Sequence, residues 1–198
     1  KEGIDWVNKK NWKWTANFLM GKQLSDSRLG ILGMGRIGRA VAERARSFGM
    51  KIHYHNRTRL NKDLEKNAIY HDSLKSLLSV SDFFSINCPA TKETKNIIND
   101  ETIKYFPDGA VISNSARGDM INDDAMVKAL KSGKIFSLGL DVYNGEPNIH
   151  PDYLKLPNVF ILPHLGSSTI KTRTAMADLA IKNIEEFFKT GKCCNKVS

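Results

Sequence analysis

Three side chains with complementary chemistry each follow a short apolar run of this chain. They are Arg117, Glu146 and His164. A guanidinium in a loop of small residues can bind a carboxylate through two hydrogen bonds, and an imidazole can exchange a proton near neutral pH. Taken singly, each also has an ordinary explanation: a loop cation, a solvated glutamate, and a histidine that only packs. The elements that carry them therefore decide whether the three form a site.

A second chemical signal is the glycine set Gly33, Gly35 and Gly38, which has the spacing G-x-G-x-x-G. The apolar run Leu29–Leu32 precedes it, and a helical apolar pattern that ends at Gly49 follows it. A dinucleotide site requires this context, because the glycines permit a tight turn, close approach of a pyrophosphate, and close packing of helix on strand. The N–H groups at the helix start then bind the phosphate charge. A plain turn is the alternative.

The residues after the next predicted strand indicate which dinucleotide binds. In NAD-type sites an acidic residue about 20 positions after the glycines bonds the ribose 2′-hydroxyl. Here the sequence reads Asn56-Arg57-Thr58-Arg59, and the first acid is Asp63. Two arginines can bind a 2′-phosphate, which a carboxylate would repel. The sequence therefore favours NADP(H), with NAD(H) as the alternative and solvated loop arginines as the ordinary explanation.

Apolar runs and helical patterns alternate along the chain. Predicted strands are residues 29–32, 51–55, 68–70, 82–87, 110–114, 135–140 and 159–162, and predicted helices follow residues 38, 74, 122 and 168. This alternation predicts parallel βαβ units in a doubly wound, Rossmann-type α/β sheet. Ligands of such sheets bind outside the carboxyl ends of the strands, where Arg117, Glu146 and His164 fall. Residues 1–25 show no clean periodicity, and their three tryptophans need partners on this domain or in a subunit interface.

The composition bounds the class of protein. With 198 residues, 41% of them hydrophobic, the chain can bury one domain, and it has no apolar run long enough to span a membrane. Three cysteines, two of them adjacent, indicate a reducing, cytoplasmic setting, and we expect no metal site. A net charge of +9 could serve nucleic acid binding, but the 30 Lys and Arg residues are scattered. Because the chain lacks an initiator Met, we expect it to be part of a longer polypeptide.

Four motifs together carry a family resemblance. They are LGILGMGRIG (29–38), NSARG (114–118), GLDV (139–142) with Glu146-Pro147 after it, and PHLGSST (163–169). In this order they cover nearly the whole chain. The chain resembles the nucleotide-binding domain of the D-isomer-specific 2-hydroxyacid dehydrogenases, nearest to their glyoxylate/hydroxypyruvate reductase branch. Formate dehydrogenases are similar but carry Gln in place of Glu146.

The resemblance implies a catalytic set of Arg117, Glu146 and His164. Arg117 would hold the carboxylate of a small 2-oxo acid and polarise its carbonyl. Protonated His164 would give a proton to the carbonyl oxygen while the nicotinamide gives hydride to the carbon. Glu146 would bind the other ring nitrogen of the histidine and stabilise its protonated form. The implied activity is NAD(P)H-dependent reduction of a 2-oxo acid, such as glyoxylate or hydroxypyruvate, to the D-2-hydroxy acid.

The glycine motif, the strand ends and the resemblance also indicate a cofactor-binding set. Its members are Gly33, Met34, Gly35, Arg36, Ile37, Gly38, Asn56, Arg57, Thr58, Arg59, Cys88, Pro89, Thr94, Ser115, Ala116, Arg117, Asp141, His164, Gly166 and Ser167. By resemblance, Asp141 binds the carboxamide, and Ser115 and Ala116 lie along the nicotinamide.

Three segments follow from these observations. We expect residues 1–25 to connect and dimerise, residues 26–170 to form the NAD(P)-binding domain, and residues 171–198 to form a helix with a wide apolar face. Family members carry a further substrate domain on which that helix packs, and it is largely absent from this chain. We therefore expect a homodimer that binds the cofactor but catalyses poorly by itself.

A binding protein is the main alternative. Transcriptional corepressors of the same fold use NAD(H) largely to control their assembly and also keep an Arg, Glu and His set. Arg57 and Arg59 argue against this class, because the corepressors resemble the NAD-type branch. A nucleic acid binder that uses the surplus charge is the third hypothesis.

Overall fold

The computed structural model describes residues 2–10, 12–193 and 195. The chain divides into two compact units, residues 1–163 and residues 164–198, and each is described by itself. No helix in the described part of the chain is long and apolar enough to cross a membrane.

A parallel sheet forms the centre of the first unit. Its seven strands are β1 (Arg28–Leu32), β2 (Lys51–His55), β3 (Ile69–Tyr70), β4 (Phe83–Ile86), β5 (Ala110–Asn114), β6 (Ile135–Leu140) and β7 (Val159–Ile161). The order β3-β2-β1-β4-β5-β6-β7, with every pair parallel, confirms the predicted doubly wound, Rossmann-type sheet. The strand order reverses between β1 and β4, which is the point where ligands bind in such sheets.

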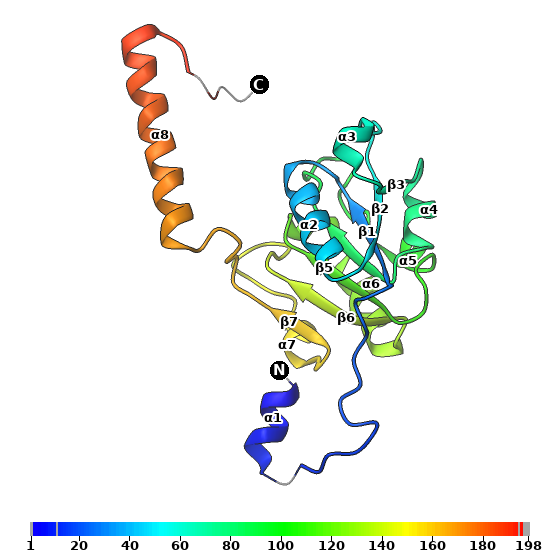
Figure 1. The fold of residues 1–198 in the computed structure, drawn as a ribbon. Coiled ribbons are helices and arrows are strands. Elements are labelled where there is room, and N and C mark those ends of the chain that lie inside the picture. Colours follow the sequence, from blue (N-terminus) through cyan, green and yellow to red (C-terminus); the bar gives the residue numbers. More distant parts are fainter. Residues whose placement is uncertain (1, 11, 194, 196–198) are drawn as a thin grey trace. The chain divides into compact units, whose positions relative to one another are not determined.

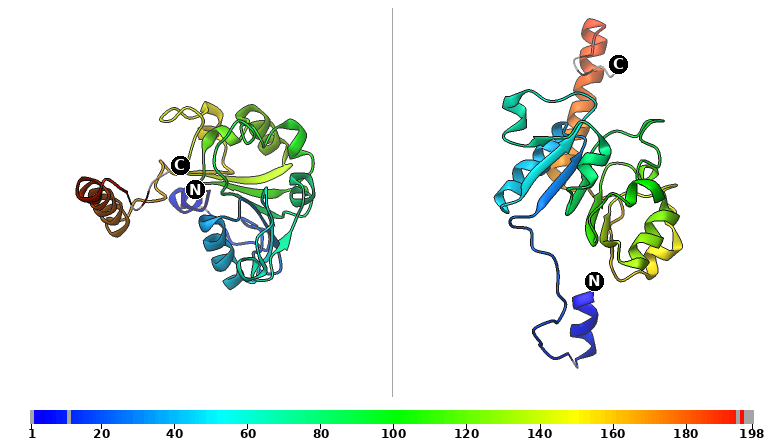
Figure 2. Two further views of the ribbon diagram at one scale, coloured as in Figure 1. Left: turned by 90° about the horizontal axis from the view of Figure 1, so that it is seen from above. Right: turned by 90° about the vertical axis from the view of Figure 1, so that its right-hand side faces the viewer.

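Helices lie on both faces of this sheet. On one face lies α2 (Arg36–Ser47), and on the other lie α4 (Leu74–Leu78), α5 (Asp100–Ile103) and α6 (Asp123–Ser132) (Figures 1 and 2). Neighbouring residues of β1 point to opposite faces of the sheet: Ile31 packs in the core on the α2 side, and Leu32 packs in the core on the α4 side. The strands are thus packed between two cores, which hold their carboxyl ends in position.

Polar side chains and glycines set the ends of the helices. Asn122 accepts a hydrogen bond from the Ala125 N–H at 2.9 Å and begins α6, and Gly133, with a φ of 79°, ends it, as the sequence predicts. Sequence analysis missed α3 (Lys62–Glu65), α5 and α7 (Pro151–Lys155). These three helices have four or five residues and, unlike α4 with its leucines at 74, 77 and 78, show no apolar repeat at helical spacing.

The amino-terminal segment is more ordered than its sequence pattern indicates. Residues Glu2–Lys9 form the helix α1, although no periodicity predicts one. Trp6 packs edge-on against Phe18 at 5.5 Å, and the Lys9 ammonium lies 5.0 Å from the Trp6 ring. These local contacts hold a helix that would be marginal on propensity alone. Trp12 stacks on the same phenylalanine, whereas Trp14 is 79% exposed.

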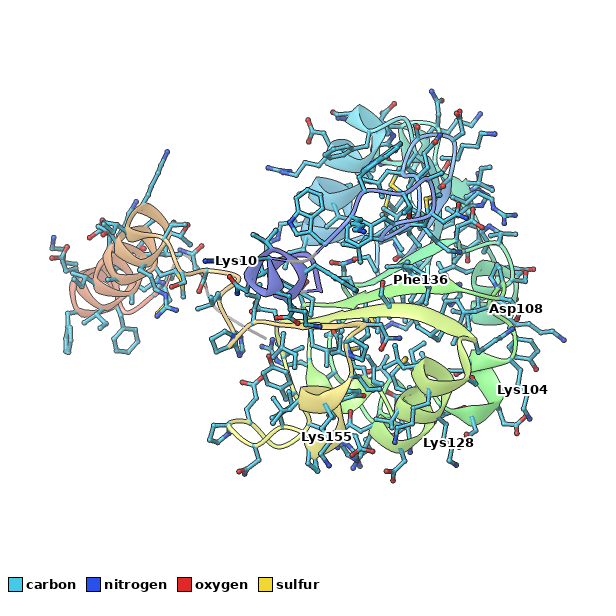
Figure 3. The ribbon with its side chains drawn as sticks, turned by 90° about the horizontal axis from the view of Figure 1, so that it is seen from below. Lys10, Lys104, Asp108, Lys128, Phe136 and Lys155 are labelled. Atoms are coloured by element: carbon cyan, nitrogen blue, oxygen red, sulfur yellow. The ribbon has the colours of Figure 1, made fainter. Side chains whose placement is uncertain are left out.

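The face of the sheet that α2 covers over β1 and β2 is open over β5, β6 and β7. A hollow of about 1090 Å³ lies there, and its lining includes the apolar side chains of Val111 and Phe160. Phe136, which lies on β6 (Figure 3), also lines it and is 42% exposed. Because the hollow has few polar groups that converge, it is a packing surface and not a site for the chemistry considered above.

The surplus positive charge is dispersed over the surface. Lys104, Lys128 and Lys155 lie apart from one another at the periphery (Figure 3). Each has a carboxylate partner within 4 Å; the partners are Glu101, Asp100 and Asp152, respectively. The lysines of this part of the surface are thus interspersed with acids and do not form a continuous basic patch.

The second unit consists mainly of α8 (Ile170–Thr190). The Thr169 hydroxyl accepts a hydrogen bond from the Thr172 N–H at 3.1 Å, so the helix begins at Ile170, within two residues of the predicted start. Gly191, with a φ of 70°, ends it. None of its residues is buried, and Phe188 is 83% exposed. The apolar face that the sequence predicts is therefore open.

An ion pair between β1 and β4 makes the fold sensitive to acid. Asp82 accepts hydrogen bonds from the Nε of Arg28 at 2.9 Å, its Nη2 at 2.8 Å and its backbone N–H at 2.9 Å. The Arg28 guanidinium holds the pKa of the Asp82 carboxyl below its usual range. A depressed pKa in the folded state means that the contribution to stability is complete above the pKa of the unfolded chain, about 4, and is lost as the pH falls below it.

We expect Asp82→Asn to lower the free energy of unfolding by about 1 kcal/mol at pH 7, because the partners are partly exposed to solvent. The difference from the parent should shrink as the pH falls below about 4, where the parent carboxylate becomes protonated. Urea denaturation at pH 7 and pH 3 measures both values, with the exposed Asp63→Asn as control. An equal loss at the two pH values would contradict a charge-dependent role.

Candidate cofactor and active site

The carboxyl ends of six neighbouring strands lie side by side in register. His55 pairs with Leu32, Leu32 with Ile86, Ile86 with Asn114, Asn114 with Leu140, and Leu140 with Ile161. Neighbouring strands are about 4.8 Å apart, so the loops after them open along an edge roughly 24 Å long. This edge carries the glycine turn, the arginine loops and the loop of Glu146.

The glycine turn has a different reason for glycine at each position. At Gly33 the φ is 92°, and a Cβ would collide with the backbone of Cys88. At Gly38 a Cβ would collide with the carbonyl oxygen of Gly33, so helix and turn pack as closely as the motif predicts. At Gly35 a Cβ would meet no atom within 4 Å. The packing of the chain therefore requires glycine at 33 and 38 but not at 35, where approach by a ligand supplies the reason.

The start of α2 is suited to an anion. Gly35 is its N-cap residue, so no side chain caps the first N–H groups, and the first turn contains no acid. The helix dipole and these N–H groups give the turn a partial positive charge.

Beside the turn lies a cavity of about 480 Å³. Among the predicted cofactor residues it is lined by Gly33, Gly35, Asn56, Arg57, Thr58, Cys88, Pro89 and Thr94. Residues that sequence analysis did not propose also line it; they include His55, Asn87, Thr91 and Glu93. The Oδ1 atom of Asn87 is buried and has no hydrogen-bond partner among the described residues. Such an atom in a cavity wall fits a donor group on a bound ligand.

Other predicted cofactor residues lie outside this cavity. The Met34 side chain is fully buried, and its N–H donates to Oδ1 of Asn56 at 2.6 Å. Arg36 lines a separate hollow of about 330 Å³ beside α2, and Ile37 is 66% exposed. Arg59 is bound to Glu65. The turn thus presents its backbone to the cavity, and none of these four residues lines it.

Charges and burial set the reactivity of the cavity wall. Burial raises the pKa of the Cys88 thiol to about 11, so this cysteine is a neutral wall residue and not a nucleophile. A hydrogen bond from Thr91 lowers the pKa of Glu93, and the positive charge of Arg57 lowers it further. Arg57 therefore acts electrostatically within the cavity. In the described part of the chain no cluster of three or more His, Cys, Asp or Glu residues is arranged to hold a metal ion.

Asn114, at the end of β5, holds the loop that carries Arg117. Its side chain is buried; Nδ2 donates to the carbonyl of Arg117 at 2.8 Å, and Oδ1 accepts from the N–H of Ala116 at 3.0 Å. Ser115 and Arg117 remain exposed. A buried amide thus fixes the backbone while the guanidinium faces solvent. Asn114 is the first residue of the NSARG motif, but the motif alone does not indicate its role.

Tyr143 connects the loop of Glu146 to two neighbouring loops. Its N–H donates to Oε1 of Glu146 at 3.0 Å, and its hydroxyl donates to the carbonyl of Leu162, two residues before His164. A Cβ on Gly118, directly after Arg117, would collide with the backbone of Tyr143. Burial raises the pKa of the Tyr143 hydroxyl, so it remains a donor. Sequence analysis missed this residue, because nothing in the pattern marks a tyrosine in a polar loop.

The remaining predicted residues are placed only in part. Asp141 is half-buried, and its N–H donates to the carbonyl of Asn114 at 3.1 Å. His164, Gly166 and Ser167 belong to the second unit, so their meeting with Arg117 stays a prediction. His164 has a φ of 54°, a left-handed conformation that costs free energy for a side chain with a Cβ. Such strain is concentrated at functional sites.

Comparisons with known proteins agree with a nucleotide-binding domain. Residues 1–166 match the family described as D-isomer specific 2-hydroxyacid dehydrogenase, NAD binding domain. The chain is 43% identical over 190 residues to a glycerate dehydrogenase from Hyphomicrobium methylovorum, covering 94% of this chain and 59% of that protein.

Solved structures give the same result. A glyoxylate reductase from Paecilomyes thermophila has a TM-score of 0.91 and 41% identity, over 98% of this chain and 58% of that one. An NADPH-dependent glyoxylate/hydroxypyruvate reductase from Sinorhizobium meliloti, in complex with NADP and malonate, has a TM-score of 0.86 and 32% identity, over 100% of this chain and 59% of that one. The chain thus spans somewhat more than half the length of these relatives.

The glycines give a matched pair of tests. We expect Gly35→Ala to leave the melting temperature unchanged, because its Cβ meets no atom within 4 Å, but to weaken dinucleotide binding by about tenfold or more, because the methyl group blocks the pyrophosphate. Gly38→Ala should instead lower the melting temperature, because helix and turn must separate. Thermal unfolding and fluorescence titration with NADPH measure the two effects. Tight binding by Gly35→Ala would rule out this turn as the pyrophosphate site.

Proposed function

The chain belongs to the D-isomer specific 2-hydroxyacid dehydrogenase family, and we propose that it is the nucleotide-binding part of an NADPH-dependent reductase of small 2-oxo acids such as glyoxylate or hydroxypyruvate. The observation that carries this proposal is the in-register row of strand ends, since it brings the glycine turn, Arg57, Arg117 and Glu146 to one edge. The chain covers part of its relatives only, so the activity is proposed for the polypeptide that completes the substrate pocket.

The cofactor would bind along this edge. The backbone at Gly33 and Gly35 and the start of α2 would hold the pyrophosphate, and Asn87, Cys88 and Thr94 would line its path. Preference for NADP(H) is supported by Arg57 in the cavity wall and by the absence of an acid from residues 56–62. A relative described as NADPH-dependent agrees with this preference.

The residues at the carboxyl ends of β5, β6 and β7 would carry the reaction. When bound, the reduced nicotinamide supplies hydride to the carbonyl carbon of the substrate. Arg117 binds the substrate carboxylate and polarises the carbonyl, and the imidazolium of His164 gives its proton to the carbonyl oxygen and becomes neutral. Glu146 would bind the other ring nitrogen and stabilise the imidazolium before transfer. Asp141 would hold the carboxamide, and Ser115 and Ala116 would line the nicotinamide end of the site.

The open surfaces support a larger assembly. The exposed apolar face of α8 fits packing on a substrate domain, and residues 1–25, with Trp14 exposed, fit a role in a homodimer. A reducing, cytoplasmic location agrees with the unpaired Cys88 and Cys193. The proposed assembly and location do not affect the roles proposed for Arg117, Glu146 and His164.

The proposed chemistry is tested on the native polypeptide that carries this chain. We expect His164→Ala to lower the turnover of glyoxylate or hydroxypyruvate by about a hundredfold or more, since it removes the proton donor, and to leave NADPH affinity within a factor of two. Lys128→Ala, at an exposed position of α6 on the periphery of the domain, is the control.

Unimpaired turnover of His164→Ala would contradict the catalytic assignment. Tight NADPH binding without any oxidation of NADPH by 2-oxo acids would favour a binding protein of the same fold.

A further inference from the structure

We propose that Glu65, acting through Arg59 and Tyr54, holds the loop that reads the ribose end of the cofactor, and that Arg57 alone of the two loop arginines discriminates NADPH from NADH. The inference rests on the proposed cofactor site. It changes the expectation from the sequence, in which Arg57 and Arg59 share this role.

Arg59 is committed to another partner. Its Nε donates to Oε1 of Glu65 at 2.8 Å and its Nη2 to Oε2 at 3.2 Å, which is the two-pronged geometry of a guanidinium with a carboxylate. The guanidinium carbon also lies 5.5 Å from the centre of the Tyr70 ring. Arg59 is not among the residues that line the cavity. Both its charge and its orientation are therefore used within the loop.

Glu65 is the centre of this arrangement. Its side chain is 7% exposed, although it is a carboxylate in a short surface helix. Besides Arg59 it binds the hydroxyl of the fully buried Tyr54, at 2.6 Å, and that hydroxyl oxygen accepts from the N–H of Leu60 at 3.1 Å. The hydrogen bonds from Arg59 and Tyr54 lower the pKa of Glu65, so it is charged at neutral pH.

The loop between these contacts is held at both ends. At its start, Oδ1 of Asn56 accepts from the Met34 N–H at 2.6 Å; at its end, Leu60 and Arg59 bind Tyr54 and Glu65. Arg57 and Thr58 lie between the fixed ends and face the cavity. These hydrogen bonds thus fix the short segment of backbone that carries Arg57 and Thr58.

The two arginines differ in the charge available to a ligand. Among the described residues Arg57 makes no ion pair within 4 Å, although its charge acts on Glu93 across the cavity, whereas the Glu65 carboxylate binds Arg59 at 2.8 Å. If Arg59 turned to a 2′-phosphate, Glu65 would remain buried without its cation, which is unfavourable. Arg57 can bind the phosphate without this loss.

The test compares NADPH and NADH affinities of the 198-residue chain and its variants by fluorescence titration. We expect Arg57→Met to weaken NADPH binding by about tenfold and to change NADH binding by less than about twofold, because only the 2′-phosphate loses a partner. Arg59→Met should weaken both cofactors by the same factor, since it loosens the loop. Arg44→Met, an equal loss of charge on the exposed side of α2, is the control.

A double variant separates positioning from direct contact. Arg59→Met should also lower the melting temperature measured without cofactor, because Glu65 loses its cation. Adding Glu65→Gln, which keeps an acceptor for Tyr54 but removes the charge, should recover at least half of that loss and of the affinity for both cofactors.

Selective loss of NADPH binding in Arg59→Met, without recovery in the double variant, would show that Arg59 contacts the phosphate and would overturn the inference. Failure of Arg57→Met to lower NADPH affinity would overturn it as well. If the parent chain binds neither dinucleotide, the proposed function is wrong and the cofactor part of the inference falls with it; the melting temperatures then still decide whether Glu65 and Arg59 hold the loop.

Discussion

The alignment of the parallel strand ends is the constraint on which the rest of this structure depends. Two cores, one on each face of the sheet, fix the positions of β1, β4, β5 and β6, so the residues after them begin at one level. Arg57 and Arg117 follow the ends of β2 and β5 within a few residues, so no long loop is needed to bring them to this edge. An edge long enough to bind a charged dinucleotide therefore results directly from packing apolar residues on both faces of a parallel sheet.

At this edge buried polar groups fix the backbone, and exposed arginines are available to a ligand. Asn114 and Glu65 are almost fully buried and spend their hydrogen bonds on backbone or on neighbouring side chains, whereas Arg117 and Arg57 are exposed. A satisfied polar group in the interior is rigid, because losing a partner leaves it unpaired where water cannot replace it. The backbone that carries Arg117 is thus held in place by buried Asn114, and the backbone that carries Arg57 by buried Glu65.

Sequence patterns were sufficient for the sheet and for the residues at its edge, and insufficient for what supports them. The apolar runs predicted all seven strands, and the spacing of Gly33, Gly35 and Gly38 predicted the turn, because each of these signals is local. The ion pair of Arg59 with Glu65 and the hydroxyl of Tyr143 on the Leu162 carbonyl depend on how separate loops fold together, which no local pattern records. The helix α1 escaped prediction for the same reason, since it depends on Phe18. Whether His164 meets Arg117 is a question of two units, and it stays a prediction.

The contact between Gly118 and the backbone of Tyr143 has a consequence for anyone who redesigns the pocket. The loop after β5 and the loop after β6 touch without an intervening side chain, and Tyr143 extends the connection to the end of β7. A longer or bulkier sequence grafted into one loop will displace the others, so libraries that vary these loops one at a time will sample mostly distorted scaffolds. Changing what these loops bind calls for the three segments to be exchanged together as a unit.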